Sequence, residues 1–327
     1  EMKKIGLLYG IENTFPEALM EKINTKNKIN VSAELIKIGG VRMDEMFDYN
    51  VILDRVSFEA PFYRSVLKNA MLKGIHVFNN PFWCSADDNF FHASLGQKIG
   101  IKTPKTIILP SKELPRGTTP DTMRNLIYPL NWEAIFDYIG FPAFIKPNIY
   151  NRTHNEYKVY NSNEFFSAYD LTGDQTMLLQ ESIEYDEYYR CYVIGKKETR
   201  IMNYDPSKPL HLRYSPGEVK IDKKLADEIE KISLKICIAL GFDLNAIEFA
   251  LKNSELYAID FFQPAPLAKK SYLHKDNFNW LVDATADFLI RVAKEGKYFP
   301  SDFTWSGFLK GPKSPVKRQK KSKTVQK

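Results

Sequence analysis

Two acidic residues, Glu248 and Asp260, each interrupt an otherwise apolar stretch of the sequence. Both stretches have the pattern of strands, and the Lys252–Glu255 connection, which contains Asn-Ser, predicts a hairpin that brings the two carboxylates together. Such a pair is costly without compensation, because like charges repel and an apolar setting solvates them poorly. Magnesium removes the conflict by binding carboxylates together with substrate phosphates. Gln263 offers a further carbonyl oxygen, whereas the simpler alternative is a pair of edge-strand acids that face water.

Other polar residues that can recognise an anion or a nucleotide stand at strand ends upstream of these acids. Lys146 lies near the end of the run Phe-Ile-Lys-Pro, where an inward ammonium group could meet phosphate oxygens. The run Met-Leu-Leu-Gln-Glu-Ser-Ile is an apolar strand that leads into a polar step at Glu181, and Glu187 follows six residues later.

Three downstream arginines are candidates for binding a substrate carboxylate or an acyl phosphate. Arg190 lies on a predicted strand just after Glu187, and Arg200 and Arg213 follow it. We take Arg190 and Arg213 as the candidate catalytic residues. A solvated sheet face is the alternative interpretation of these arginines, and we favour it for Arg200.

The elements that must position these residues begin with an alternation of strands and helices between Lys3 and Asn80. Strands that alternate with helices at this spacing are typical of a parallel, doubly wound α/β sheet. Gly10 after the first strand is followed by Ile-Glu-Asn-Thr, so the glycines of a dinucleotide site are missing. The expected strands are 5–9, 31–38, 50–54 and 75–78, with a helix from Pro61 to about Lys73.

The second part of the chain combines further strands with a few clear helices. Residues 141–266 are rich in strand patterns, whereas 110–129 is rich in Pro, Thr, Arg and Gly and is predicted as a surface excursion or hinge. Apolar residues at helical spacing define the helices. The remaining expected elements are a strand at 105–109 and helices at 87–99, 132–138, 224–240 and 279–294.

The composition is that of a folded globular protein. Apolar residues make up 44% and charged residues 26% of the 327 residues, which excludes a disordered or fibrous chain, and the length suggests about two domains. No stretch has the ~18 consecutive apolar residues of a membrane span, and the first strand is too short for a signal-peptide core. Cys84, Cys191 and Cys237 are widely spaced in apolar runs, which favours reduced thiols and a cytoplasmic location.

The net charge of +6 is concentrated in one terminal segment. Residues 311–327 carry seven basic and no acidic residues, so the rest of the chain holds 39 basic against 40 acidic residues. The segment has no apolar periodicity and is predicted to be disordered. A nucleic-acid partner is therefore supported by this basic tail alone and is not expected for the folded part.

The order of the polar residues, more than any one of them, resembles the ATP-grasp superfamily, in particular glutathione synthetase and the ribosomal-protein glutamate ligase. The resemblance covers roughly residues 82–266, and its phrases include Gly-Phe-Pro-Ala-Phe-Ile-Lys-Pro, Gly-Phe-Asp-Leu-Asn-Ala-Ile-Glu and Ala-Ile-Asp-Phe-Phe-Gln-Pro. It implies an α/β (α+β) ATP-grasp domain at 81–310, in which two subdomains enclose the nucleotide. Residues 1–80 would then be the preceding doubly wound pre-ATP-grasp domain, and 311–327 a basic disordered tail.

The resemblance also implies which residues bind ATP. Lys146 would contact the nucleotide phosphates, and Glu187 would accept hydrogen bonds from the ribose hydroxyls. A hinge whose backbone meets adenine would be formed by four consecutive residues, Gln180, Glu181, Ser182 and Ile183.

By the same resemblance, Glu248, Asp260 and Gln263 would hold one or two Mg²⁺ ions that bridge the phosphates. The substrates would be a small-molecule or peptide carboxylate and an amine. The carboxylate is phosphorylated, and the amine then displaces phosphate from the acyl phosphate. Relatives often form dimers or tetramers, which leaves a homo-oligomer open, and no membrane partner is expected.

Three features depart from the superfamily pattern. Asn89 stands where many relatives have a phosphate-binding lysine, and the segment 148–155 has no glycine where relatives have a glycine-rich flap. Arg152 and His154 could replace that backbone cradle with side chains, and Gln263 replaces the usual Asn. Asn89 and Arg152 are accordingly candidates for nucleotide binding. The alternative function is a catalytically weak or inactive nucleotide-binding protein with a regulatory or scaffold role.

Overall fold

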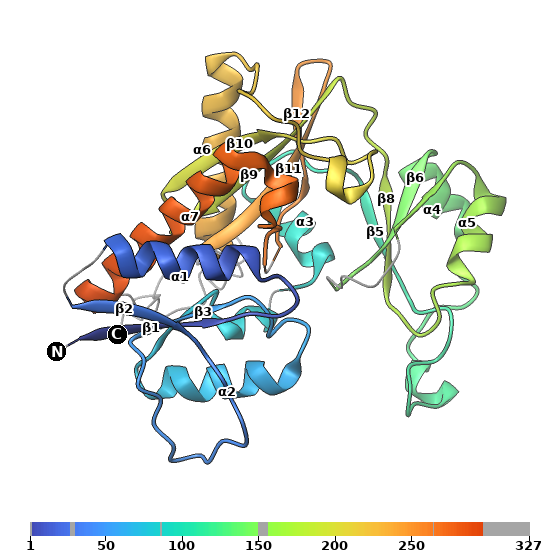
Figure 1. Cartoon of the computed structure of the whole chain (residues 1–327). Coiled ribbons are helices and arrows are strands. Elements are labelled where there is room, and N and C mark those ends of the chain that lie inside the picture. The colour runs from blue at the N-terminus through green and yellow to red at the C-terminus, as the bar shows by residue number, and fades with distance from the viewer. Residues whose placement is uncertain (1, 27–29, 86, 150–155, 264, 297–327) are drawn as a thin grey trace, which may run out of the picture.

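The computed structural model describes residues 2–26, 30–85, 87–149, 156–263 and 265–296 of the chain. These residues form three four-stranded sheets with helices on their faces (Figure 1). The mixed α/β class agrees with the expectation from the sequence, and the predicted basic tail lies outside the described residues. None of the helices in the described ranges is long and apolar enough to cross a membrane.

The first sheet is parallel, with strand order β2-β1-β3-β4. All four residues of β3 are buried, as expected for a strand that helices cover on both faces. This confirms the predicted parallel arrangement, although the second strand ends at Leu35 rather than Ile38. The elements are β1 (Lys3–Leu8), α1 (Thr14–Lys26), β2 (Val31–Leu35), β3 (Val51–Asp54), α2 (Pro61–Leu72) and β4 (His76–Phe78).

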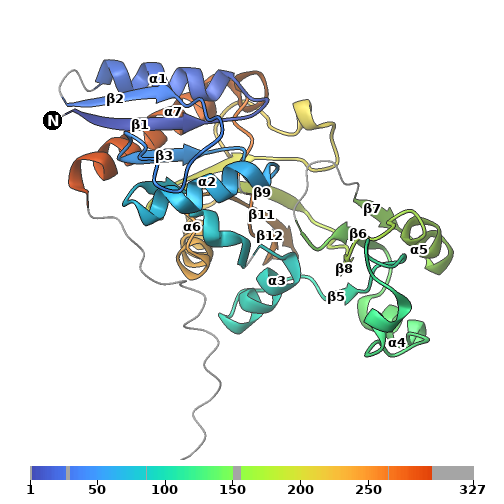
Figure 2. The ribbon, with the colours of Figure 1, turned by 90° about the horizontal axis from the view of Figure 1, so that it is seen from below.

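A long helix from the other end of the chain, α7 (Lys270–Glu295), covers the first sheet together with α1. Two views show α7 beside α1 on one face of this sheet and α2 on the other (Figure 1, Figure 2). Phe278 of α7 packs edge-on against Phe15 of α1, and one continuous apolar cluster joins this layer to the central sheet. The predicted helix 279–294 is part of α7, which begins earlier and has a non-helical residue at His274 (φ 62°, ψ 167°).

The central sheet is antiparallel, with order β10-β9-β11-β12, and α6 packs on one of its faces. In the turn between β11 and β12, Asn253 and Ser254 have φ of 50° and 64°, the left-handed conformation that a two-residue hairpin of this kind requires. In this register Glu248 stands directly opposite Asp260, which confirms the predicted pairing of the two acids. The elements are β9 (Glu187–Ile194), β10 (Glu198–Asn203), α6 (Lys223–Leu240), β11 (Leu244–Lys252) and β12 (Glu255–Asp260).

The third sheet, with order β5-β8-β6-β7, is antiparallel and forms a small lobe to one side of the other two (Figure 1). Helices α4 and α5 cover it through an aromatic cluster in which Trp132, Phe136 and Phe165 meet. The predicted excursion 110–129 carries a short 3-10 helix at 120–123. The elements, with the helix α3 that precedes them, are α3 (Asn89–Lys98), β5 (Thr106–Leu109), α4 (Trp132–Ile139), β6 (Ala143–Pro147), β7 (Tyr157–Val159), α5 (Ser162–Tyr169) and β8 (Met177–Glu181).

The turn between β9 and β10 passes so close to α7 that only glycine fits at residue 195. Gly195 has φ of 62°, and a Cβ built on it would lie 2.5 Å from the ring of Phe288. We expect Gly195→Ala to lower the free energy of unfolding by about 2–5 kcal/mol, because left-handed backbone strain adds to overpacking. Urea denaturation measures this loss.

Gly100→Ala is the matched control for that experiment. Gly100 also has a positive φ, of 78°, but apart from Gly100 and its two chain neighbours no heavy atom of the described residues lies within 4 Å of its added Cβ. Its loss should therefore stay near about 1–2 kcal/mol, the cost of backbone strain alone. Equal losses in the two variants would contradict the close packing of Gly195 on α7.

Candidate active site

A cavity of about 1050 Å³ lies between the central sheet and the third sheet. Residues 11–14, from the loop after β1 and the start of α1, also line it, so segments attached to all three sheets contribute to the cavity. Most of the residues singled out from the sequence line this cavity, namely Lys146, Gln180, Glu181, Ser182, Ile183, Arg190, Arg213, Glu248, Asp260 and Gln263.

Strand alternation decides which side chains of β9 reach the cavity. Tyr188 and Arg190 line it, whereas Tyr189 packs into the apolar layer beneath α6. Arg190 stands opposite Glu248 on β11, and Glu248 stands opposite Asp260 on β12. One cation and two acids therefore form a row across three adjacent strands.

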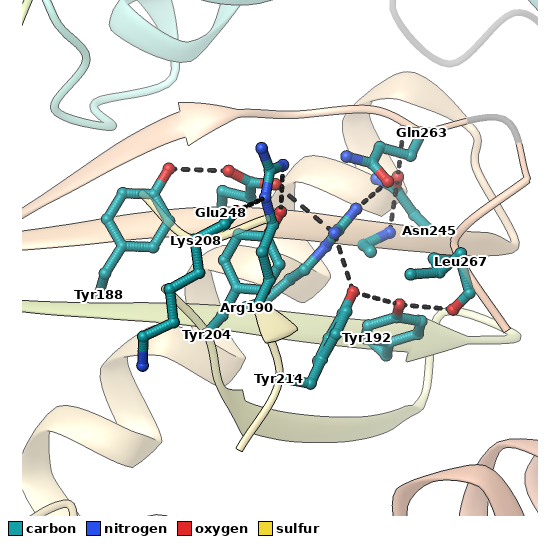
Figure 3. Close-up of polar contacts among 12 residues, drawn as sticks. Tyr188, Arg190, Tyr192, Tyr204, Lys208, Tyr214, Asn245, Glu248, Gln263 and Leu267 are labelled. Carbon is teal, nitrogen blue, oxygen red and sulfur yellow. Dashed lines mark hydrogen bonds and ion pairs between the residues drawn. The ribbon is translucent and has the colours of Figure 1, made fainter. Parts of the chain in front are cut away.

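Glu248 is buried and held by two neighbours on β9. The Tyr188 hydroxyl donates a hydrogen bond of 2.8 Å to Oε2 of Glu248, and Nη1 of Arg190 lies 3.6 Å from Oε1 (Figure 3). Burial raises the pKa of Glu248, Arg190 opposes the rise, and the charge of Asp260 adds to it. A cation that binds beside Glu248 would therefore favour its ionised form.

Asp260 is paired with a cation from the third sheet. Nζ of Lys146 lies 3.0 Å from Oδ1 of Asp260, and the lysine side chain is only 8% exposed. Burial acts to raise the pKa of Asp260, but Lys146 reverses the shift and keeps that pKa below its ordinary value. The pKa of Lys146 is raised, because burial, which lowers it, is outweighed by Asp260 and Glu156. This ion pair crosses the cavity from β6 to β12.

Arg190 is enclosed by protein, with 2% of its side chain exposed. Its guanidinium donates a hydrogen bond of 2.8 Å to the Tyr214 hydroxyl and another to Oε1 of Gln263 (Figure 3). The rings of Tyr192, Tyr204 and Tyr214 surround it, with centroids 4.9 to 5.8 Å from the guanidinium carbon. Arg190 is thus a positioning residue for Gln263, and its direct contact with a substrate stays a prediction.

The predicted hinge, residues 180–183, ends β8 and is anchored on both sides. Nε2 of Gln180 donates to Oγ1 of Thr106 (2.9 Å), and the backbone N–H of Ser182 donates to the carbonyl of Pro142 (3.1 Å). These bonds fix the backbone of the hinge at the cavity wall. The contact of this segment with adenine stays a prediction.

Glu187 lies outside the cavity lining, which does not support the expected ribose contact. It falls on the same face of β9 as Tyr189, whose hydroxyl donates to its carboxylate. Arg190, three residues further along the strand, is on the opposite face. The sequence already indicates this difference, because two residues an odd number of positions apart on a strand point to opposite faces of the sheet. Glu184, which precedes β9, lines the cavity instead.

Asn89 binds the protein backbone and is not part of the lining of the main cavity. Its amide donates to the carbonyl of Pro147 (3.2 Å), and its backbone N–H donates to the carbonyl of Asn148 (2.7 Å). It therefore ties α3 to the end of β6, so its contact with a nucleotide is not supported by this geometry. Arg152, the other candidate from the flap, lies outside the described residues.

The other two arginines have different surroundings. Arg213 lines the cavity, where Nε donates to the carbonyl of Lys208 (2.9 Å) and Nη1 to the hydroxyl of Tyr204 (3.2 Å). Arg200 instead donates from Nε to Oδ1 of Asn277 on α7 (2.7 Å). Arg200 therefore lies outside the cavity lining and packs against α7, whereas a solvated sheet face was expected for it from the sequence.

Two further residues of the site were not singled out from the sequence. Tyr188 lies two positions before Arg190 on the same strand, so strand alternation would have identified it. Glu156 lines the cavity, with its side chain open to that space. Burial by the protein around it raises the pKa of Glu156 to about 7, and the charge of Lys146 opposes this rise. No local sequence pattern indicates Glu156.

The donors around the acid pair fit a hard divalent cation and a polyphosphate. No group of three His, Cys, Asp or Glu side chains suited to a metal occurs in the described part of the chain. Glu248, Asp260 and the amide oxygen of Gln263 form an incomplete set of oxygen donors, which Mg²⁺ typically completes with phosphate oxygens and water. The cavity volume, about 1050 Å³, lies just above the range of about 300–1,000 Å³ that is typical of ligand pockets.

No family model matches the chain. Among curated proteins, the D-alanine–D-alanine ligase of Prochlorococcus marinus (strain NATL2A) is 23% identical over 173 residues, which cover 48% of this chain and 49% of that protein. The corresponding ligase of strain AS9601 is 28% identical over 136 residues, 37% of this chain and 38% of that protein. The chain therefore spans half or less of the length of these curated relatives.

Solved structures match over nearly their whole length. The D-alanine–D-alanine ligase from Bacillus anthracis complexed with ATP has a TM-score of 0.64 at 18% identity, covering 90% of this chain and 99% of that one. A RimK domain ATP-grasp protein from Sphaerobacter thermophilus has a TM-score of 0.60 at 14% identity, covering 88% and 99%. A Chryseobacterium gregarium RiPP-associated ATP-grasp ligase with ADP and peptide has 0.59 at 15%, covering 89% and 97%. At these identities the match establishes a shared fold.

The burial of Arg190 predicts a large effect on stability. We expect Arg190→Met to lower the free energy of unfolding by about 3–5 kcal/mol, because it leaves Glu248 buried without its cation. Arg200→Met is the matched control and should cost about 1 kcal/mol, the value of one hydrogen bond at a less enclosed site. Urea denaturation compares the two. If Arg190→Met cost no more than its control, the guanidinium would not be the counter-charge of the acid pair.

Proposed function

We propose that this chain, which has the ATP-grasp fold, is an ATP- and Mg²⁺-dependent carboxylate–amine ligase. The observation that carries the proposal is the row of Arg190, Glu248 and Asp260 across three strands, with Lys146 reaching Asp260 from the opposite sheet. Oxygen ligands for a metal and a cation for phosphate oxygens thus meet at one point of one large cavity. A ligase that moves a phosphoryl group onto a carboxylate needs this combination, because both reactants are anions.

The solved structures support ATP as the cofactor. The ligase from Bacillus anthracis was solved with ATP, and the ATP-grasp ligase PsnB was solved with a minimal precursor, Mg and ADP. A shared fold alone does not identify a substrate. The proposal therefore rests on the side chains of this chain, which offer donors for both a metal and a polyphosphate.

The proposed reaction has two steps. The terminal phosphoryl group of ATP moves to an oxygen of the substrate carboxylate, which gives ADP and an acyl phosphate. The nitrogen of the amine then attacks the acyl carbon, so that a C–N bond forms, phosphate leaves and the amine loses a proton. Bound Mg²⁺ would supply charge neutralisation for the phosphates during the first step. The protein's part is to align the reactants and to hold its own charges in place.

Each side chain of the row has a defined part in this proposal. Lys146 would bind phosphate oxygens, since its ammonium group already lies at the acid pair. Tyr188 and Arg190 orient Glu248 through the hydroxyl and guanidinium contacts described above. Arg213 would bind the substrate carboxylate, because it is a cation that lines the same cavity.

A second candidate function is nucleotide binding with weak or no catalysis. The observation that favours it is the amide of Asn89, which donates to the carbonyl of Pro147. The residue at this position of α3 therefore brings no positive charge to the phosphates. Such a protein would bind ATP and release no product.

Hydroxylamine gives a test that needs no knowledge of the natural amine, because it attacks an acyl phosphate and yields a hydroxamate and phosphate. We expect the protein, with ATP and Mg²⁺, to form ADP and hydroxamate from members of a panel of N-blocked amino acids and peptides. Glu248→Gln should lower that rate at least about 100-fold, because it removes a charge from the metal-binding row. Colorimetric detection of the hydroxamate measures the rate.

Glu255→Gln is the matched control. Glu255 lies at the far end of the same hairpin, is exposed and pairs with Lys102 outside the cavity. It should keep the full rate. Equal losses in both variants would contradict the role of Glu248, and binding of ATP without hydroxamate from any member of the panel would favour the nucleotide-binding alternative.

A further inference from the structure

We propose that the outer part of the cavity selects a carboxylate substrate that carries a large apolar or aromatic group, an inference that rests on the proposed ligase function. In this assignment Arg213 binds the carboxylate, and a wall of tyrosines beside it packs against the apolar group. The substrate class is thus an N-substituted amino acid, or a peptide ending in one, with a bulky apolar side chain next to the reacting carboxylate.

The wall begins at the acid pair and leads outward. The hydroxyl of Tyr188 donates a hydrogen bond to Glu248, so the ring of Tyr188 is the part of the wall nearest the acid pair. The ring of Tyr185 lies 4.9 Å from that of Tyr188, and the ring of Tyr204 lies 6.0 Å from it on another side. All three tyrosines line the cavity. An apolar group that packs on this wall is therefore adjacent to the point where a metal and phosphates would meet.

Apolar side chains from two other segments face the same space. Leu210 comes from the loop between β10 and α6, and Ile11 comes from the β1–α1 loop. Their exposed fractions are 48% and 92%, and that of Tyr185 is 39%. Exposure of three large apolar side chains around one cavity is unfavourable in water, and a bound apolar group would remove part of that surface from solvent.

The charges at this end of the cavity favour an anion at Arg213. The side-chain hydrogen bonds of Arg213 within the described residues go to the carbonyl of Lys208 and the hydroxyl of Tyr204, and neither of these carries a negative charge. Glu248 and Glu156 act on this guanidinium through space, but none of the ion pairs of the described residues involves Arg213. A bound carboxylate can therefore pair with it directly beside the tyrosine wall. Glu12, the acid contributed by the β1–α1 loop, is already paired with Arg55.

The position of Arg213 sets the order of groups in the ligand. Because its Nη1 is hydrogen-bonded to Tyr204, the cation lies at the edge of the tyrosine wall. A carboxylate bound there places the substituent on its neighbouring carbon against Tyr185 or Leu210. A small substituent leaves these surfaces hydrated, and an acidic one brings a second charge onto an apolar wall at a cost in solvation.

The experiment is a calorimetric titration of the full chain with Mg²⁺ and a non-hydrolysable ATP analogue present. The probes are N-acetylglycine, N-acetylleucine, N-acetylphenylalanine and N-acetylglutamate, each as both enantiomers where chiral. We expect the preferred enantiomer of N-acetylphenylalanine to bind at least about ten-fold more tightly than N-acetylglycine, with N-acetylleucine between them and N-acetylglutamate weakest.

Two variants and one control test which side chains produce the selectivity between the probes. Tyr185→Ala should reduce the ratio between the phenylalanine and glycine probes to below about three-fold while binding of the ATP analogue is unchanged. Arg213→Gln should weaken all the probes by a similar factor of about ten or more. Tyr138→Ala removes an exposed tyrosine of α4, outside the cavity lining, and should change neither the ratio nor the affinities.

The outcomes separate this inference from the ligase function. Equal affinities for the four probes, tightest binding of N-acetylglutamate, or no binding of any probe would overturn the selectivity, whatever the hydroxamate assay gives. Selective binding of the phenylalanine probe with no hydroxamate from any substrate would support the selectivity and count against the ligase function. A Tyr185→Ala variant that keeps the full ratio would overturn the assignment of the tyrosine wall.

Discussion

The structure depends on how two carboxylates are kept side by side in a mostly apolar sheet. Glu248 and Asp260 stand opposite each other on β11 and β12, where their repulsion and poor solvation would oppose folding. Each acid has its own compensation: Tyr188 and Arg190 contact Glu248, and Lys146 contacts Asp260. Removing Arg190 would leave the buried carboxylate of Glu248 without its cation, which is costly, whereas Asp260, whose side chain is 37% exposed, would lose Lys146 at a smaller cost.

The compensating groups need support of their own, and it comes from distant parts of the chain. Three tyrosine rings enclose the guanidinium of Arg190, and the hydroxyl of Tyr192 donates to the carbonyl of Leu267 in the segment after β12. The carbonyl of Tyr214 contacts His274 at the kink of α7, the helix that also packs on the first sheet. The acid pair is therefore linked through Arg190, Tyr214 and α7 to the first sheet. Helix α7 thus joins the tyrosines around Arg190 to the first sheet, because it packs on that sheet and contacts Tyr214 through His274.

Local patterns predicted much of this fold, and the failures have physical causes. The hairpin that pairs Glu248 with Asp260 followed from two apolar runs and an Asn-Ser turn, because hairpin geometry is set within a few residues. Glu187 lies three residues from Arg190 on one strand, so the two side chains face opposite ways, and the ribose contact implied by the resemblance did not take this alternation into account. Burial of Arg190 and the backbone contacts of Asn89 depend on segments far along the chain, and one sequence does not reveal those.

The ion pair between Lys146 and Asp260 also has a mechanical consequence. The lysine belongs to the small lobe and the aspartate to the body, so their attraction pulls the lobe toward the body across the cavity. A ligand that binds either residue competes for this attraction. By thermodynamic reciprocity, binding of that ligand weakens the attraction between lobe and body, and any movement of the lobe away from the body raises the affinity for the ligand by the same factor. The ion pair between Lys146 and Asp260 thus also holds the small lobe against the body across the cavity.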